Sequence, residues 1–103
     1  IFDTLNTAEA SVTVIDVRNR TEWDAGHLPG ALHIPIGSLA ERLGEIPRDK
    51  PIVVQCQSGA RSAIATSHLQ RLGLSDLHDL VGGFAAWESA GQPVERNAVA
   101  AGV

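Results

Sequence analysis

Short apolar runs separated by polar turns form the main pattern of this chain. Runs rich in β-branched and aliphatic residues, bounded by turn residues, are typical of strands. Four such runs predict strands at residues 12–15, 32–34, 52–54 and 77–81. The run at 52–54 has no polar alternation, which is typical of a parallel strand that is covered on both faces.

The segments between these runs carry apolar residues at helical spacing. It predicts helices at residues 21–25, at about 39–44, at about 62–72 and at 84–90. Ser38 precedes the second helix and Glu41 lies three residues later, a pattern that predicts a capping box. In the third helix, residues at helical spacing predict one apolar face, made of Ile64, Ala65, His68, Leu69 and Leu72.

Strands that alternate with short helices predict an α/β fold with a mostly parallel sheet. The chain has 103 residues, the size of one ordinary domain, and it contains no internal repeat. We therefore expect a single domain over residues 1–103. Its core is expected at about 12–95, with a loose tail at about 97–103.

The composition and the charge exclude several classes of function. The formal net charge is −4, so the chain lacks the basic face that nucleic-acid binding needs. No apolar run approaches the length that spans a bilayer, so a membrane partner is not expected. The single cysteine cannot form an internal disulfide, and a free thiol suits a reduced, cytoplasmic setting.

That cysteine, Cys56, follows the strand at 52–54 and begins a short polar loop. The loop contains Gly59 and Arg61 and leads directly into a predicted helix. In open α/β sheets, ligands bind beyond the carboxyl ends of the strands. Backbone N–H groups and a helix N-terminus at that edge would favour an anion and lower the pKa of a thiol. The pattern predicts a reactive thiol in an anion site, and the alternative is a buried structural cysteine.

The segment from Cys56 to Ser62, Cys-Gln-Ser-Gly-Ala-Arg-Ser, resembles the active-site loop of rhodanese (thiosulfate sulfurtransferase) domains. Other segments are similar to further signatures of that family, in fitting order from about residue 12 to residue 95: Asp16-Val17-Arg18 with Glu22-Trp23, Gly26-His27-Leu28-Pro29-Gly30-Ala31 with Ile34-Pro35, and Gly82-Gly83 with Trp87, Gly91 and Pro93. The resemblance implies a three-layer domain in which helices flank a mostly parallel central sheet of about five strands.

The resemblance also implies a sulfurtransferase with a ping-pong mechanism. Cys56 would take a sulfane sulfur from thiosulfate or a glutathione-type persulfide and carry it as a persulfide. The acceptor would be cyanide in vitro, or a cellular thiol or sulfite. No cofactor and no metal are implied.

Six residues of the loop are expected to bind the substrate around the sulfur: Gln57, Ser58, Gly59, Ala60, Arg61 and Ser62. The backbone N–H groups of residues 57–61 would converge on the bound sulfur, and Gly59 permits the tight geometry that this needs. Arg61 would pair with an anionic donor. The hydroxyls of Ser58 and Ser62 would hydrogen-bond the persulfide, although Ser62 could equally be only the N-cap of the helix.

Two functions of other classes stay open. Rhodanese-like domains that act as phosphatases or arsenate reductases resemble this chain but have a loop one residue longer, and a persulfide sulfur needs a smaller cradle than a phosphate. Some rhodanese-like domains are non-enzymatic regulatory modules, which often lack the cysteine. The stretch that begins at Gln57 is also similar to rhodanese domains fused behind metallo-β-lactamase-fold domains, which handle persulfides, so a fused upstream domain is a further expectation.

The remaining polar and aromatic residues favour structural roles. Asp16, Arg18 and Glu22 are expected to form an ion-pair set near the carboxyl edge of the sheet. The four histidines (His27, His33, His68 and His78) match no common zinc spacing, and His27 is expected near the rim of the site. Trp23 and Trp87 are expected to pack in the core.

Overall fold

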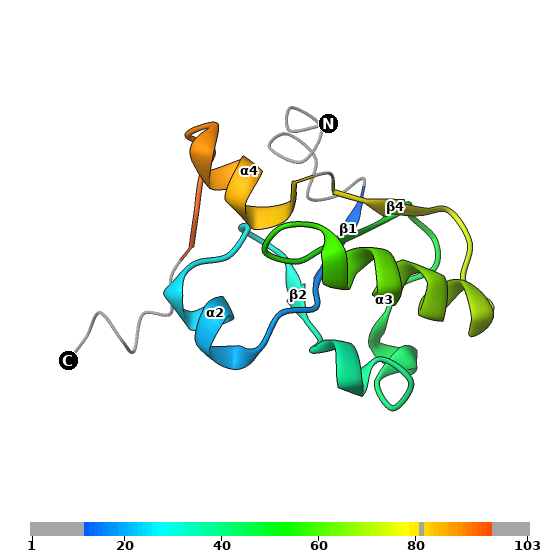
Figure 1. Ribbon diagram of the computed structural model, residues 1–103. Coiled ribbons are helices and arrows are strands. Elements are labelled where there is room, and N and C mark those ends of the chain that lie inside the picture. Colours follow the sequence, from blue (N-terminus) through cyan, green and yellow to red (C-terminus); the bar gives the residue numbers. More distant parts are fainter. Residues whose placement is uncertain (1–11, 81, 96–103) are drawn as a thin grey trace.

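The computed structural model describes residues 12–80 and 82–95 (Figure 1). Its strands are β1 (Thr13–Asp16), β2 (Leu32–His33), β3 (Ile52–Gln55) and β4 (Leu77–Asp79). They form one parallel sheet in the order β2-β1-β3-β4. The predicted α/β fold with a parallel sheet is confirmed, and the described residues contribute four strands where about five were expected.

The strands end together at one edge of the sheet. Asp16 is paired with Gln55 across β1 and β3, and Val54 is paired with Asp79 across β3 and β4. The strands run in the same direction, so the segments that follow β1, β3 and β4 leave the sheet side by side. Cys56 directly follows Gln55 and therefore lies at the carboxyl edge, as the sequence predicted.

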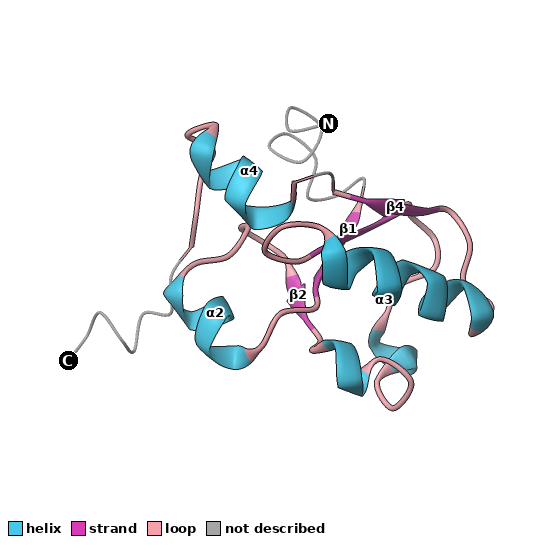
Figure 2. Cartoon of the chain, in the orientation of Figure 1, coloured by secondary structure: helices cyan, strands magenta, loops and turns pink. Residues whose placement is uncertain are grey.

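Helices and 3-10 turns surround this sheet, and the loops that join them are long compared with the strands (Figure 2). The helices are α2 (Arg20–Ala25), α3 (Ala60–Arg71) and α4 (Gly83–Ser89), and the 3-10 turns are η1 (Ile36–Ser38) and η2 (Leu43–Glu45). Side chains of β3 alternate between two hydrophobic clusters. Ile52 and Val54 pack with α3 and the 3-10 turns, whereas Val53 packs with Phe84 and Trp87 of α4.

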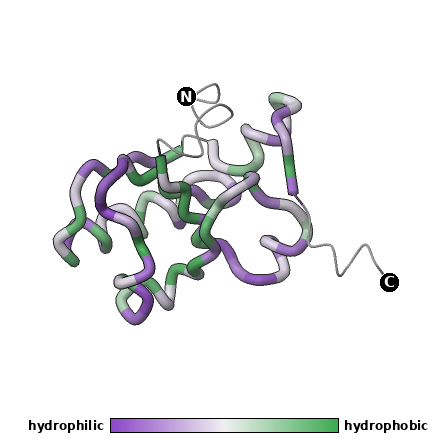
Figure 3. The backbone as a smooth tube through the Cα atoms, turned by 180° about the vertical axis from the view of Figure 1, so that it is seen from behind, coloured by the Kyte–Doolittle hydropathy of each residue, from purple (hydrophilic) through white to green (hydrophobic). Residues whose placement is uncertain are grey.

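Burial of these apolar side chains stabilises the three-layer arrangement. Hydrophobic stretches alternate with hydrophilic ones along the backbone (Figure 3). Trp87 is only 1% exposed, which confirms its predicted place in the core. Trp23 is half-buried and stacks on the ring of His27, with 3.5 Å between the ring centroids.

The predicted helix at 39–44 is wrong. Turn η1 ends at Ser38, directly before this segment, and turn η2 begins at Leu43, so Ser38 ends η1 instead of capping a helix with Glu41. Burial of Leu39, which is 0% exposed, fixes this segment against the core instead.

Helix α3 also differs from its prediction, both in the residue at which it begins and in the residues that form its buried face. It begins at Ala60 after Gly59, so Ser62 lies inside the helix and is not its N-cap. Its buried residues are Ser62, Ala65 and Leu69, whereas Ile64 is 64% exposed. Ile64 lies about 100° around the helix from Ala65, so the apolar face is narrower than the i, i+4 spacing suggested.

The other helices agree more closely with the sequence. Helix α2 begins one residue before the predicted start, because Asn19 caps it: Glu22 N–H donates to Asn19 Oδ1 at 2.9 Å, and Asn19 N–H donates to Glu22 Oε1 at 3.2 Å. β4 ends at Asp79. The predicted tail at 97–103 lies outside the described residues, and the single domain over 1–103 stays a prediction. In the described ranges, no helix has the length and apolar character to cross a membrane.

Candidate active site

The sulfur of Cys56 lies inside a cradle made by its own loop. Cys56 is 1% exposed. The backbone N–H of Gly59 donates to Sγ at 3.1 Å, and that of Ser62 donates at 3.3 Å. Gly59 has φ +112°, a left-handed conformation that glycine adopts at little cost, and it turns the chain so that both N–H groups face the sulfur. Two donors aimed at one sulfur favour its anionic form.

Burial and hydrogen bonding act on this thiol in opposite directions. Burial raises the pKa of Cys56, and the hydrogen bonds of its sulfur with the side chain of Ser62 and with the backbone N–H groups of Ser62, Gly59 and Ser58 lower it. The hydrogen bonds prevail, so the pKa of the thiol lies below its ordinary value. The thiolate, which is the nucleophilic form, is therefore more populated near neutral pH than for a free cysteine.

The N-terminus of α4 holds the loop from the other side. Phe84 N–H donates to the carbonyl of Cys56 at 2.7 Å, and Ala85 N–H donates to the carbonyl of Gln57 at 2.9 Å. This contact brings two backbones together at Gly83, where a Cβ atom would lie 2.2 Å from the carbonyl oxygen of Cys56. The sequence predicted only a turn at Gly82-Gly83. Its tight approach to the loop is a role that the spacing alone did not reveal.

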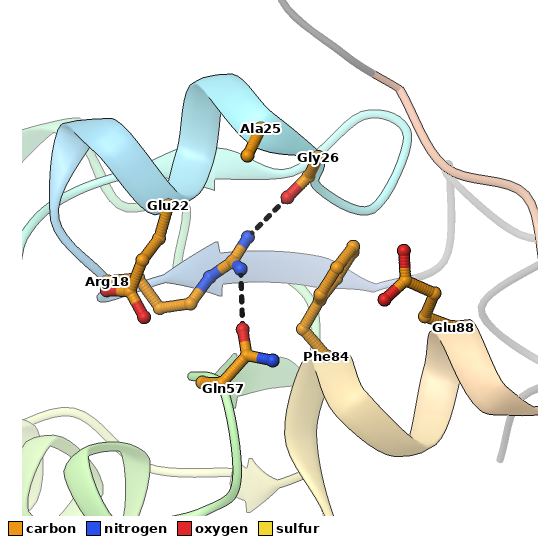
Figure 4. A pocket seen from close by; sticks show the side chains of 7 residues that line it. All are labelled: Arg18, Glu22, Ala25, Gly26, Gln57, Phe84 and Glu88. Atoms are coloured by element: carbon orange, nitrogen blue, oxygen red, sulfur yellow. Dashed lines mark hydrogen bonds between the residues drawn. The ribbon is translucent and has the colours of Figure 1, made fainter.

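Arg18 supports the loop from the segment that follows β1. It is 1% exposed, forms an ion pair with Asp16 at 2.8 Å, and donates to the carbonyl of Gly26 at 2.7 Å. Its Nη1 donates to Gln57 Oε1 at 3.0 Å, and its guanidinium lies over the ring of Phe84, as Figure 4 shows. The expected pairing of Asp16 with Arg18 is present, and it ties the side chain of Gln57 to the sheet edge.

Arg61 points to a carboxylate. Its Nη1 and Nη2 donate to the two oxygens of Glu22 at 2.7 and 2.9 Å, so the third member of the expected ion-pair set is paired with α3 instead of Arg18. Hydrogen bonds from Arg61 lower the pKa of Glu22 to about 2, against the opposing effect of burial. The role of Arg61 as a clamp for an anionic donor stays a prediction, and in this structure Glu22 neutralises its charge.

Ser62 connects the sulfur to a residue that the sequence did not single out. The thiol of Cys56 donates to Ser62 Oγ at 3.5 Å, and the single hydroxyl hydrogen of Ser62 has two oxygen acceptors within reach, Asp79 Oδ1 and, at 3.1 Å, the carbonyl oxygen of Gly59. Asp79 ends β4 beside β3, so the parallel pairing of these strands was the signal that could have placed it near the loop.

A pocket of about 220 Å³ opens beside the loop (Figure 4). It is lined by Arg18, Glu22, Ala25, Gly26, Gln57, Phe84 and Glu88. Gln57 is the predicted site residue that lines it. The side chains of Ser58 and Ala60 are exposed to solvent at the outer face of the loop.

The histidines near the site take part in packing. His27 is 8% exposed, and its Nδ1 lies 2.9 Å from the carbonyl oxygen of Trp23. His33 Nε2 lies 2.8 Å from the carbonyl oxygen of Arg18. In the part of the chain that the structure describes, no three His, Cys, Asp or Glu side chains gather as metal ligands would.

Comparison with known proteins places this chain among rhodanese-like domains. Residues 3–90 match the family model of the rhodanese-like domain. The chain is 40% identical over 74 residues to YqhL, an uncharacterized protein of Bacillus subtilis, and the match covers 72% of this chain and 59% of YqhL. It is 36% identical over 84 residues to the thiosulfate sulfurtransferase GlpE of Shewanella oneidensis, and this match covers 82% of the chain and 83% of GlpE.

Solved structures show the same fold. A rhodanese-related protein of Thermoplasma volcanium superposes with a TM-score of 0.81 at 36% identity, covering 91% of this chain and 93% of that protein. A Rhodopseudomonas palustris protein, named a possible tyrosine phosphatase, superposes with a TM-score of 0.79 at 29% identity, covering 91% of this chain and 78% of that protein.

Proposed function

Because the chain belongs to the rhodanese-like domain family, which includes proteins named as thiosulfate sulfurtransferases, we propose that it transfers sulfane sulfur through a persulfide on Cys56. The observation that carries this proposal is the cradle around the sulfur. Two backbone N–H groups lie 3.1 and 3.3 Å from Sγ, in a loop that runs only from Cys56 to Arg61. Such a cradle suits a single anionic sulfur atom.

The reaction has two half-reactions. The Cys56 thiolate attacks the sulfane sulfur of the donor, a new S–S bond forms, and the donor's bond to that sulfur breaks. The bonding electron pair leaves with sulfite or with a thiolate. A nucleophilic acceptor then attacks the outer sulfur, and Cys56 leaves as a thiolate that the N–H groups of Gly59 and Ser62 stabilise.

The charges around the loop favour a persulfide donor over thiosulfate. Arg18 is neutralised by Asp16, and Arg61 is neutralised by Glu22. The loop therefore offers backbone dipoles instead of a net positive charge. A glutathione-type persulfide, with one anionic sulfur to bind, suits this environment better than the thiosulfate dianion, and the pocket beside Gln57 is large enough for part of its organic group.

A phosphatase or arsenate reductase is the second candidate. The similar Rhodopseudomonas palustris fold, named a possible tyrosine phosphatase, is the observation in its favour. The six-residue loop disfavours a phosphatase or an arsenate reductase, because a tetrahedral phosphate needs a wider ring of N–H groups than one sulfur atom does. Release of a coloured phenol from a small aryl phosphate by the protein, but not by Cys56→Ser, would favour this candidate over sulfur transfer.

The partners that follow from the proposal are small sulfur compounds: a donor such as thiosulfate or glutathione persulfide, and an acceptor such as sulfite, cyanide or a cellular thiol. A non-enzymatic regulatory role is disfavoured by the cradle around Cys56. A cytoplasmic location and a fused upstream domain also belong to this proposal, since both suit a free thiol that handles persulfides.

Mass spectrometry of the treated protein tests the proposed function. Incubation with glutathione persulfide, followed by removal of the donor, should add one sulfur atom (about 32 Da) to the chain. Cyanide should remove this mass, and Cys56→Ser should never acquire it. Thiosulfate should load the protein more slowly than the persulfide does. A mass that both donors leave unchanged, in the absence of reducing agent, would refute sulfur transfer by this site.

A further inference from the structure

The hydroxyl of Ser62 has one hydrogen and three neighbours that could accept it. Its oxygen lies 3.5 Å from Sγ of Cys56 and 3.1 Å from the carbonyl oxygen of Gly59, and it is also within hydrogen-bond distance of Asp79 Oδ1. The direction of this one hydrogen decides how Ser62 acts on the sulfur. When the hydrogen points to the sulfur, it stabilises the thiolate. When it points elsewhere, the oxygen lone pair faces the sulfur and accepts the thiol hydrogen instead.

Asp79 is the strongest of these three acceptors. An ionised carboxylate accepts a shorter and stronger hydrogen bond than a neutral carbonyl or a sulfur atom. Among the described residues, the other charged groups around the loop are paired: Asp16 with Arg18 and Glu22 with Arg61. Asp79 forms no ion pair within the described part of the chain, so its charge is directed at Ser62.

We propose that Asp79 is a positioning residue for the nucleophile: it takes the hydrogen of the Ser62 hydroxyl, so that the oxygen of Ser62 accepts from the Cys56 thiol and the thiolate is left to the backbone N–H groups. This assigns Asp79 a function in the site at the end of β4. It deepens the proposed function by explaining how the reactivity of Cys56 is set.

The chemical consequence is a sulfur that stays nucleophilic. A thiolate with more stabilising donors has a lower pKa but attacks a sulfur–sulfur bond more slowly, with a Brønsted coefficient of about 0.4–0.5. By keeping one donor away from the sulfur, Asp79 limits the fall in the pKa of Cys56 that Gly59 and Ser62 N–H cause. The thiolate that forms then attacks the donor faster.

Asp79→Asn tests this arrangement with almost no change of shape. The amide of the new residue donates to Ser62 Oγ, which releases the hydroxyl hydrogen towards the sulfur. We expect the pKa of the Cys56 thiol to fall by about one unit, since one hydrogen bond to the thiolate is gained and one nearby negative charge is lost. The rate constant of the fully ionised thiolate with a small aryl disulfide should fall about threefold.

The measurement is the pH dependence of the reaction with that disulfide, because Cys56 is the only thiol in the chain. The midpoint gives the thiol pKa, and the plateau gives the nucleophilicity. Asp76→Asn is the matched control: Asp76 directly precedes β4 at the opposite end of the strand, is exposed, and hydrogen-bonds His78 instead of Ser62. It removes the same charge and should leave both values unchanged.

A second background separates the hydroxyl from direct electrostatics. In a Ser62→Ala protein, Asp79→Asn should shift the midpoint by less than half as much as in the wild type, because the hydroxyl that transmits the effect is gone. Asp79→Ala provides a further variant and should also lower the midpoint. Unchanged or raised midpoints in both Asp79 variants, or an equal shift without Ser62, would overturn the proposal. These assays require no sulfur transfer, so they are independent of the mass test for persulfide formation.

Discussion

Gly83→Ala changes the point where α4 meets the loop of Cys56. Gly83 has φ +57°, a left-handed conformation that costs an L-residue about 1–2 kcal/mol. The added Cβ atom would lie 2.2 Å from the carbonyl oxygen of Cys56 and 2.9 Å from the carbonyl oxygen of Gln57. Both atoms belong to the backbone, so no side-chain rotation can relieve the overlap, and α4 and the loop must move apart.

The cost follows from the contacts that this movement breaks. Two hydrogen bonds cross the gap, from Phe84 N–H at 2.7 Å and from Ala85 N–H at 2.9 Å. Each contributes about 1 kcal/mol to stability. Together with the backbone strain, we expect the free energy of unfolding to fall by about 3–4 kcal/mol, a large part of the total for a small domain.

Urea unfolding and the reactivity of Cys56 measure the two consequences. The variant should unfold at a lower urea concentration, and its thiol should react more slowly with a small disulfide near neutral pH, because the N–H groups of the loop no longer converge on the sulfur. Gly91→Ala is the matched control. Gly91 has φ +74° with nothing within 4 Å of its added Cβ, so it tests strain without the overlap. If the two variants match in stability and reactivity, the reasoning is refuted.

Three further predictions concern buried or paired polar groups. Arg18→Leu should lower the free energy of unfolding by about 3–5 kcal/mol, because it leaves the carboxylate of Asp16 buried without its cation; a urea midpoint equal to that of wild type would contradict this. Gln55→Leu should raise the free energy of unfolding by about 1–3 kcal/mol, because both polar atoms of this buried amide lack a hydrogen-bond partner among the described residues. A lowered urea midpoint would show that the amide does form hydrogen bonds. Glu22→Gln should reduce the acid sensitivity of folding. Arg61 lowers the pKa of Glu22 from 4.5 to about 2, so this contribution is present above about pH 4.5 and is lost as the pH falls towards 2; equal losses of stability in both proteins over that range would exclude it.

Local patterns in the sequence predicted the parts of the fold that depend on local chemistry. The β-branched run before Cys56 formed the central strand β3, and the parallel direction followed from strands alternating with helices. The position of Cys56 at the carboxyl edge followed from the same two facts. Gly59 adopted the left-handed conformation that its place in a tight loop requires.

The errors arose where tertiary contacts decide the outcome. The segment at 39–44 has a capping pattern, but burial of Leu39 between two 3-10 turns holds it in another conformation. The ion pair between Arg61 and Glu22 was not predicted, because nothing in the spacing shows that Glu22, 39 residues earlier, comes within 2.7 Å; the expected role of Arg61 towards an anionic donor stays a prediction. The close approach of α4 to the loop at Gly83 could not be predicted from the sequence either, because it depends on how two distant segments pack.

The contacts that shape the loop of Cys56 are of two kinds, and they should respond differently to substitution. The backbone contacts from α4 position the sulfur and also hold α4 on the sheet, so a change at Gly83 alters stability and reactivity together. The contact between the side chains of Ser62 in α3 and Asp79 in β4 sets the direction of one hydrogen, and the backbone hydrogen bonds to the sulfur do not run through it. A side chain at the end of β4 can therefore adjust the reactivity of Cys56 while the backbone cradle stays in place.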